Sequence, residues 1–346
     1  MTIIYLYRSL AAFGGVERIF IDKANYLAEH YGYHVYIITW EQGGHSIVYP
    51  LSPKVTHVDW GILFYRQYQY GLFKRMFMQW KMEKEFFKKL SNFVHTTQAD
   101  IVIGASCEFT TMAGMDLLQR KTHTILETHS MRTSIEKNNP PAGNLLMRWA
   151  FKRRDKQLHQ YIKHMSAFVT LTHNDAKDWS DITPQARIIP NMLHRYPAEI
   201  SPDKKTQKRI ITAGRLVEQK GYDLLLDAWS KVHQKHPEWI LDIYGEGEDK
   251  TMLLEKRKNL ALENSVLFHP PTLDIYQKYM DSDFYVMSSR FEGFGLVLAE
   301  AMSCGIPCVS FDCPHGPSDI IKDYEDGLLV EKENIKELAC LLYTSP

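Results

Sequence analysis

The chain has 346 residues, 45% hydrophobic and 24% charged, which is ordinary for a folded globular protein and excludes a disordered or collagen-like one. Lys plus Arg and Asp plus Glu both number 41, so the net charge is zero and no net positive charge attracts the chain to nucleic acid. Because this length exceeds what one hydrophobic core usually organises, the sequence predicts two domains.

The apolar run at the N-terminus meets Arg8 after only about six residues, too few for the core of a signal peptide. It is instead predicted to be a buried strand at Ile3–Tyr7. No stretch approaches the roughly 20 apolar residues that cross a bilayer, so any membrane association is predicted to be peripheral.

Short apolar, β-branched runs alternate with longer amphipathic segments through the first half. This rhythm predicts a parallel sheet covered by helices on both faces. The predicted strands are Ile3–Tyr7, His34–Thr39, Ile101–Ile103, Thr124–Glu127 and Phe168–Leu171.

Two segments depart from this rhythm. Trp60–Trp80 is dense in aromatic residues and runs into four lysines, and Met147–Lys156 is rich in Arg and Lys. Helices of this kind can lie on an anionic membrane surface. The simpler interpretation is favoured: one apolar side of each helix packs into the core, and the charged side faces solvent.

The α/β rhythm restarts after a polar stretch, Tyr196–Lys208, which is predicted to be the linker. The expected domains are residues 1–197 and 205–346, each doubly wound, with ligands at the carboxyl ends of the strands. The predicted strands of the second half are Arg209–Ala213, Leu241–Tyr244, Val266–Phe268, Phe284–Met287, Pro307–Ser310 and Leu328–Val330.

The strongest chemical signal is SSRFEGFGLVLAEAMSCGIP, residues Ser288–Pro307. A strand ends in a loop that carries Gly293, Phe294 and Gly295, and a helix is predicted from Leu296. Glycines at such a junction let backbone amides approach an anion, and the helix N-terminus adds positive potential. Glu292 lies in the loop and Glu300 more than one turn into the helix, so their roles are expected to differ: one facing a sugar ring, the other a ribose diol.

EGFGLVLAEAMSCGIP closely resembles the E-x7-E motif of glycosyltransferase family 4, whose members are retaining enzymes of the GT-B fold. The resemblance implies two Rossmann-like domains facing a central cleft, an acceptor-side domain first and a nucleotide-sugar-binding domain second. It also implies that the second domain is truncated at its C-terminus, since the family's chains continue further.

The family resemblance extends to other segments in the same order. ITAGRLVEQKGYDLLLDAW resembles the start of the family's second domain and implies that Arg215 and Lys220 bind the donor diphosphate. AAFGGVERIF resembles its glycine loop, with Gly14 and Gly15, and ETHSM places His129 near the transferred sugar.

The implied catalytic residues are His129, Glu292, Arg215 and Lys220. The implied donor-binding residues are Gly14, Gly15, Arg215, Lys220, Gly293, Phe294, Gly295, Leu296 and Glu300. Gly245, in a GxG turn after a strand, is assigned mainly to structure.

The resulting functional prediction is a metal-independent hexosyltransferase that moves a sugar from a UDP-sugar to a hydroxyl of a glycan or lipid-linked acceptor in cell-surface polysaccharide assembly. No cofactor and no nucleic acid partner are expected. No DxD triplet follows a predicted strand, and Cys304, Cys308 and Cys313 lack partners at zinc spacing. Five scattered cysteines without a CxxC pair favour the cytoplasm, with the inner face of the plasma membrane as a candidate location.

Two alternatives stay open. One is a nucleotide-sugar epimerase of the same fold, and the other is a non-catalytic nucleotide-sugar-binding subunit. A phosphorylase is less favoured because no lysine for pyridoxal phosphate is evident, and a dehydrogenase because the first strand lacks a full GxGxxG.

Overall fold

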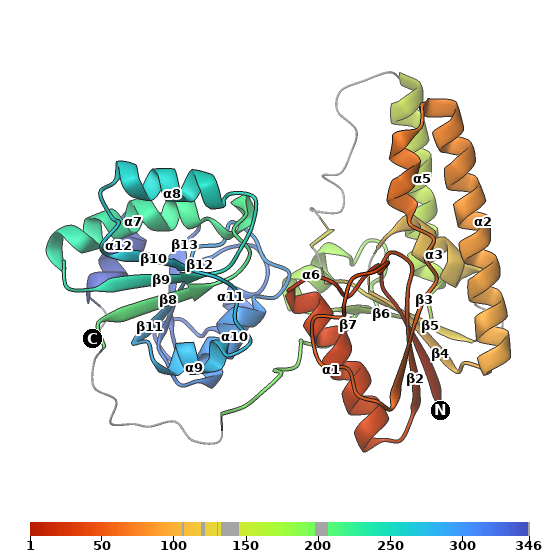
Figure 1. Ribbon diagram of the computed structural model, residues 1–346, viewed down its shortest axis with the longest axis horizontal. Helices are drawn as coiled ribbons and strands as arrows, with labels where there is room; N and C mark the ends of the chain where they lie inside the picture. Colours follow the sequence, from red (N-terminus) through yellow and green to blue (C-terminus); the bar gives the residue numbers. More distant parts are fainter. Residues whose placement is uncertain (106, 119–121, 130, 133–144, 198–206, 345–346) are drawn as a thin grey trace. The chain divides into compact units, whose positions relative to one another are not determined.

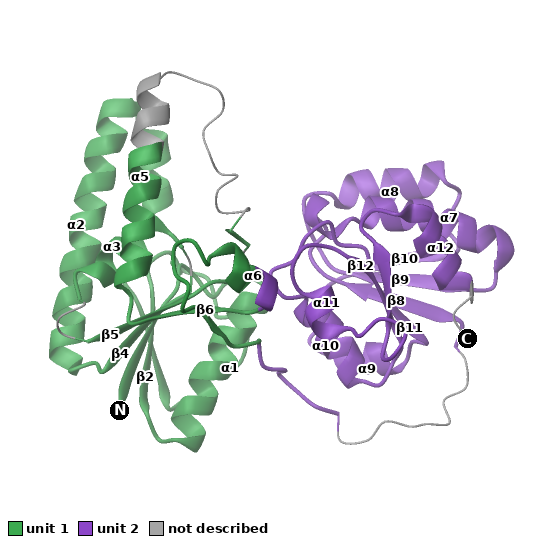
Figure 2. Cartoon of the chain, turned by 180° about the vertical axis from the view of Figure 1, so that it is seen from behind, with its two compact units in different colours: residues 1–171, 175–190 green, residues 172–174, 191–346 purple. Residues whose placement is uncertain are grey.

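The computed structural model describes all residues except 106, 119–121, 130, 133–144, 198–206 and 345–346; of residues 145–151 and 344 it describes the backbone alone. Most of the predicted linker, and Arg148 of the second basic stretch, therefore lie outside the described residues. The chain divides into two compact units (Figure 2). Unit 1 comprises Met1–Leu171 and Asp175–Pro190, and unit 2 comprises Thr172–Asn174 and Asn191–Pro346.

Unit 1 is built on a parallel sheet in the order β3-β2-β1-β4-β5-β6-β7 (Figure 1). Its strands are β1 (Thr2–Leu6), β2 (His34–Thr39), β3 (Val55–Asp59), β4 (Ile101–Gly104), β5 (His123–Glu127), β6 (Ala167–Thr170) and β7 (Arg187–Ile188). Its helices are α1 (Gly15–His30), η1 (Phe64–Gln69), α2 (Leu72–Thr97), α3 (Phe109–Asp116), α5 (Leu145–His164) and α6 (His173–Asp178), the last of which joins unit 1 from Asp175.

All five strands predicted for the first half are confirmed within about one residue at each end. The strands β3 and β7 were not predicted. They lie at the two edges of the sheet, and their residues are largely half-buried or exposed, so neither carries the continuous apolar run of a central parallel strand.

Unit 2 has a second parallel sheet, in the order β10-β9-β8-β11-β12-β13. Its strands are β8 (Arg209–Ala213), β9 (Ile240–Tyr244), β10 (Val266–His269), β11 (Phe284–Met287), β12 (Cys308–Asp312) and β13 (Leu328–Glu331), all of which were predicted. Its helices are η2 (Glu218–Lys220), α7 (Tyr222–Lys235), α8 (Lys250–Asn259), α9 (Ile275–Met280), α10 (Leu296–Ser303), α11 (Pro317–Ile320) and α12 (Ile335–Thr344).

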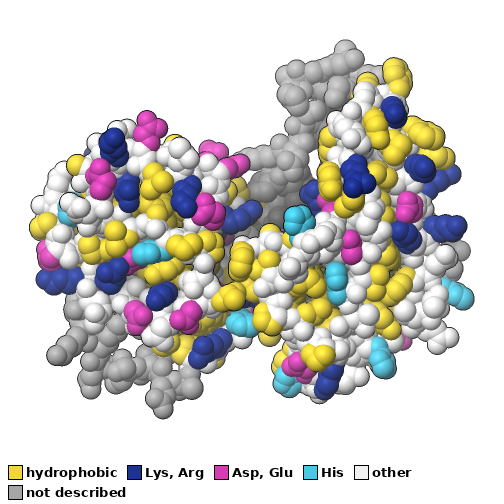
Figure 3. Space-filling model, in the orientation of Figure 1, with side chains coloured by type: hydrophobic (Ala, Val, Ile, Leu, Met, Phe, Trp, Pro, Cys, Tyr) yellow, Lys and Arg dark blue, Asp and Glu magenta, His cyan; other side chains and the backbone are white. Residues whose placement is uncertain are grey.

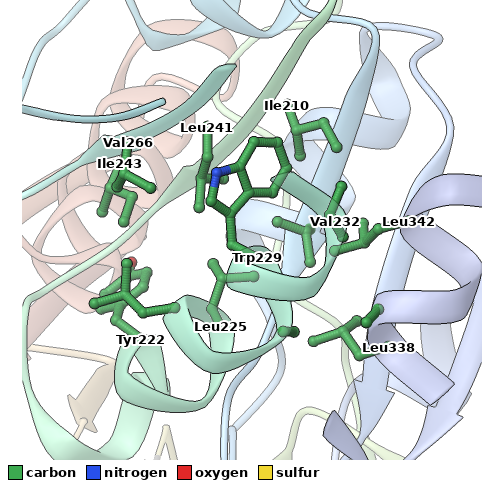
Figure 4. Close-up of a cluster of buried hydrophobic side chains, with 14 of the residues drawn as sticks. Ile210, Tyr222, Leu225, Trp229, Val232, Leu241, Ile243, Val266, Leu338 and Leu342 are labelled. Carbon is green, nitrogen blue, oxygen red and sulfur yellow. The ribbon is translucent and has the colours of Figure 1, made fainter. Parts of the chain in front are cut away.

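Hydrophobic clusters fill both faces of the unit 2 sheet, because successive side chains of a strand point to opposite sides. Ile210 of β8 packs with α7 and α12, whereas Ile211, the next residue, packs with α9 and α10. Figure 4 shows Trp229 of α7 at the centre of the first cluster, surrounded by strand residues such as Leu241 and by Leu338 of α12. Burial on both faces holds the strand ends of unit 2 in fixed positions.

The prediction of a core stripe in Trp60–Trp80 is wrong for most of that segment. Trp60 and Phe64 do pack against the core of unit 1, but most apolar residues of the first two turns of α2 are exposed. No helix among the described residues has the length and apolar character needed to cross a bilayer.

Candidate functional site

The strand order of unit 2 reverses direction between β8 and β11. From β8 the chain proceeds outward to β9 and β10, and β11 then returns to the other side of β8. In open α/β sheets, ligands bind outside the carboxyl ends of the strands at such a reversal. The loops that follow β8 and β11 contain Arg215 and Lys220 in the first and Glu292 to Gly295 in the second, so the fold brings these predicted residues together.

Hydrogen bonds join these two loops directly. The amide of Arg290 donates to the carbonyl of Gln219 at 2.8 Å, and the side-chain amide of Gln219 donates to the carbonyl of Phe291 at 2.9 Å. Ser288 Oγ donates to the carbonyl of Lys220 at 2.9 Å. A side chain on Gly221 would overlap the carbonyl oxygen of Ser288. The two loops are therefore held together before any ligand binds.

A bidentate salt bridge stabilises the contact between the loop after β11 and the start of α7. Arg290 binds the Asp223 carboxylate with both terminal nitrogens, at 2.8 and 2.7 Å. Burial raises the pKa of Asp223, but the hydrogen bonds and charge of Arg290 outweigh this and leave the pKa below its usual range. Neither residue is predicted from the sequence as part of the site.

Lys220 and Glu292 form a largely buried ion pair. Lys220 Nζ lies 2.6 Å from Glu292 Oε1, and Ser289 Oγ donates to the same oxygen at 2.6 Å. Glu292 is 5% exposed, so the two carboxylates of the motif are not a solvated pair. Lys220 is thus held in place by a carboxylate of its own unit.

Arg215 has a different environment from Lys220. It lies directly after Gly214 in the loop that follows β8, is exposed, and forms no ion pair with a described residue. The amide of Leu216 donates to the carbonyl of Glu246 at 2.9 Å, which ties this loop to the one after β9. The two cations predicted to bind the same diphosphate therefore differ: Lys220 is paired with Glu292, whereas Arg215 is exposed to solvent.

The glycine loop before α10 adopts a conformation that suits its composition. Gly295 caps the helix with φ of +88°, in the left-handed region that favours glycine. A side chain on Gly316 would overlap the carbonyl of Phe294, so a third loop packs closely here. Glu300, in the second turn of α10, is 3% exposed, as its place in an apolar run predicts.

The GxG turn after β9 is structural, as predicted. A side chain on Gly245 would overlap the carbonyl oxygen of Gly214, and one on Gly247 would overlap the backbone of Leu216. The loops after β8 and β9 therefore approach each other at backbone contact distance.

In unit 1 the sheet reverses between β1 and β4, and the predicted glycine loop follows β1. Gly14 is the extended N-cap of α1 and Gly15 its first residue. A carboxylate lies beside them: a side chain on Gly14 would overlap Glu17, whose Oε1 accepts a hydrogen bond from Tyr7 Oη at 3.1 Å. Glu17 is a negative group in the first turn of the helix, where the helix dipole stabilises it.

His129 belongs to a buried charged cluster in unit 1. Its Nε2 lies 3.3 Å from Glu127 Oε2, and Lys23 Nζ from α1 lies 2.9 Å from the same oxygen. The ring of Phe20 meets the imidazole edge-on at 5.9 Å between centroids. The side chain of His129 is 3% exposed, and its Nδ1 is buried without a hydrogen-bond partner among the described residues.

The Glu127 carboxylate is held in its charged form. Burial raises its pKa, but the hydrogen bond to His129 and the positive charge of Lys23 together lower it below the ordinary value of 4.5. The Lys23–Glu127 pair is not predicted from the sequence, because 104 positions separate the two residues and no local pattern links them. Ser289 and Arg290 had a local signal, because both lie within the motif that begins at Ser288.

The described residues contain no group of three or more His, Cys, Asp or Glu side chains arranged to hold a metal ion. Cys304, Cys308 and Cys313 are buried free thiols. Burial, together with the negative charge of Glu292, raises the pKa of Cys313 to about 12, so this thiol stays protonated.

Comparison of the fold with solved structures identifies its class. The chain aligns over 99% of its length with TarM from Staphylococcus aureus, a complex with Fondaparinux, alpha-GlcNAc-glycerol and UDP, covering 92% of that chain with a TM-score of 0.76 and 16% identity. At this identity the likeness shows the fold alone. Two parallel-sheet Rossmann-like units of this kind define the GT-B class, as predicted.

The sequence comparisons point to glycosyltransferases. Residues 198–342 match the family described as glycosyl transferases group 1. An uncharacterised glycosyltransferase of Haemophilus influenzae is 29% identical over 344 residues, 96% of this chain and 87% of that relative. The amylovoran biosynthesis glycosyltransferase AmsD of Erwinia amylovora is 42% identical over 144 residues, 42% of this chain but only 39% of that relative.

Proposed function

We propose that this protein is a metal-independent, retaining glycosyltransferase that moves a hexose from a UDP-sugar to an acceptor hydroxyl in cell-surface polysaccharide assembly. One observation carries the proposal. Arg215, Lys220 and the glycine loop before α10 all follow β8 or β11, between which the strand order of unit 2 reverses, and all lie within the segment that matches the glycosyltransferase family. The UDP in the TarM complex supports the proposed donor, and the amylovoran biosynthesis named for AmsD supports the proposed pathway.

The proposed donor diphosphate lies at the N-terminus of α10, where amides after Gly295 are directed toward an anion. Arg215, which is exposed and has no ionic partner among the described residues, approaches a phosphate without first breaking a salt bridge. When the bond from the anomeric carbon to the β-phosphate breaks, negative charge grows on the departing UDP. Cations and amides placed in advance at that position stabilise this charge.

Lys220 serves the same diphosphate in a different way. An ammonium group has three N–H donors, and Glu292 takes one of them at 2.6 Å. The pair holds Lys220 in position and leaves two donors for phosphate oxygens. In this arrangement Glu292 orients the cation and the sugar, and a covalent intermediate on Glu292 is not invoked. Glu300 is assigned to the ribose diol.

Unit 1 supplies the acceptor-side groups in this proposal. His129, held by Glu127, is assigned to a hydroxyl of the sugar or acceptor, because its buried Nδ1 has no hydrogen-bond partner among the described residues. Gly14 and Gly15 are assigned to a phosphate or acceptor group. The amide of Gly14 already donates to the carbonyl of Ala12 at 3.1 Å, so the amide of Gly15 is the donor assigned to that group. Glu17 lies beside this loop, and its carboxylate is assigned to a hydroxyl of the same ligand.

The test is calorimetric titration with UDP, followed by incubation with UDP-sugars with and without acceptor. We expect UDP binding to fall at least about tenfold in Arg215→Ala and Glu300→Gln, since each loses a charged hydrogen bond of about 1.5–3 kcal/mol. Glu263→Gln, an exposed glutamate of the same unit, is the matched control and is expected to bind normally.

The same incubations separate the competing functions. Transfer of sugar to acceptor supports the proposal. An epimerised UDP-sugar formed without acceptor indicates an epimerase, and tight UDP binding without any product indicates a binding subunit. Normal UDP affinity in both site variants would contradict the assigned donor site.

A further inference from the structure

The long helix α2 has two halves with opposite environments. Its second half packs into the core of unit 1 through Phe86, Leu90 and Val94. In its first half most large apolar side chains face solvent instead: Phe73 is 87% exposed and Trp80 is 50% exposed. Monomeric soluble proteins rarely display such a group of large apolar residues without a partner.

The exposed residues of the first half of α2 form a continuous stripe. They are spaced by one and by three to four residues, which places them on one side of the helix. These exposed residues are Leu72, Phe73, Met76, Phe77 and Trp80. The neighbouring helix η1, in contact with α2, adds two exposed tyrosines. Figure 3 shows hydrophobic and Lys or Arg side chains intermixed over this end of unit 1. We call the exposed side chains of residues 65–82 the aromatic-basic surface.

The charge of the aromatic-basic surface has a single sign. Residues 65–82 include Arg66, Lys74, Arg75 and Lys81 and no Asp or Glu, although the whole chain is neutral. Two of these cations lie over tyrosine rings: Lys74 is 4.4 Å from the ring centre of Tyr70, and Arg75 is 4.1 Å from that of Tyr68. Cation–π contacts of this kind keep the positive charges beside the aromatic groups.

We propose that the aromatic-basic surface binds an anionic lipid bilayer. Phe and Leu side chains enter the boundary between headgroups and acyl chains, Trp and Tyr lie at headgroup level, and the surrounding Lys and Arg attract anionic headgroups. A second copy of the chain is a poorer occupant. A symmetric contact would place four cations against four cations with no acidic residue in the surface to compensate.

The experiment is co-sedimentation of the full chain with phosphatidylcholine vesicles that contain or lack phosphatidylglycerol. We expect binding only when phosphatidylglycerol is present, and release at high salt because screening weakens the headgroup attraction. Lys74→Gln with Lys81→Gln is expected to weaken binding about 25-fold, about fivefold for each cation. Phe73→Ser with Phe77→Ser is expected to weaken it at least about tenfold with the charge unchanged.

The matched controls lie on unit 2. Tyr324 and Lys322 are comparably exposed, and Tyr324→Ser with Lys322→Gln is expected to leave vesicle binding unchanged. If the phenylalanine variant does not fold, the lysine variant alone decides. Equal binding to both vesicle types, no binding to either, or an oligomer that the phenylalanine variant dissociates would each overturn the proposal.

Discussion

Replacing Glu127 with Gln tests the buried charged cluster of unit 1. The substitution keeps the shape of the side chain but removes the negative charge that Lys23 and His129 share. The side chains of Lys23 and Glu127 are 16% and 10% exposed, so water compensates little for the lost partner. Breaking such a pair from one side leaves an uncompensated charge and costs about 3 kcal/mol.

This loss converts into a measurable shift. For a unit of this size, about 3 kcal/mol lowers the thermal midpoint by roughly 6–12 °C. The assay is thermal unfolding at pH 7, with Glu85→Gln as the matched control. Glu85 pairs with Lys89 on the exposed face of α2, and its loss is expected to cost no more than about 0.5 kcal/mol.

The effect of Glu127→Gln also has a defined pH dependence. Because the folded-state pKa of Glu127 lies below its ordinary value of 4.5, the stabilisation is present above pH 4.5 and is lost as the pH falls through the lowered pKa. The wild type and the variant are therefore expected to converge in acid. The double variant with Lys23→Met is expected to recover much of the stability, because it removes the unpaired charge. A loss below about 1 kcal/mol at pH 7, or one that persists unchanged in acid, would refute this account of the cluster.

Three further outcomes are expected. Arg215→Ala is expected to lower kcat for sugar transfer by about 100-fold or more with an unchanged thermal midpoint, since its charge acts on the departing diphosphate; steady-state kinetics with equal turnover would refute this role. Asp175→Asn is expected to stabilise unit 1 increasingly between pH 4 and pH 8. Burial raises the pKa of Asp175 to about 7, so the wild type loses stability as the pH rises through that value, with an upper limit of about 4 kcal/mol in urea unfolding. Gly245→Ala is expected to destabilise unit 2 by about 2 kcal/mol or more and to weaken UDP binding, because the added Cβ overlaps the carbonyl of Gly214; an unchanged midpoint would show that the two loops can separate.

The sequence by itself determined the α/β class and most of the strands. Central parallel strands are buried on both faces, so each appears as an apolar run such as Arg209–Ala213 or Phe284–Met287, and these are confirmed. Local chemistry also gave the position of α10, because a glycine that adopts positive φ and a following apolar helix are encoded within a few residues.

Only the tertiary structure decided which distant groups meet. Lys220 and Glu292 are 72 positions apart and Lys23 and Glu127 are 104 apart, and nothing local encodes either pair. The first pair exists because parallel strands place the segments after β8 and β11 at the same edge of the sheet, and the second because α1 packs beside the end of β5. The exposure of Phe73 was equally undetermined, since an aromatic residue on an amphipathic helix has the same sequence pattern whether a core covers it or solvent does.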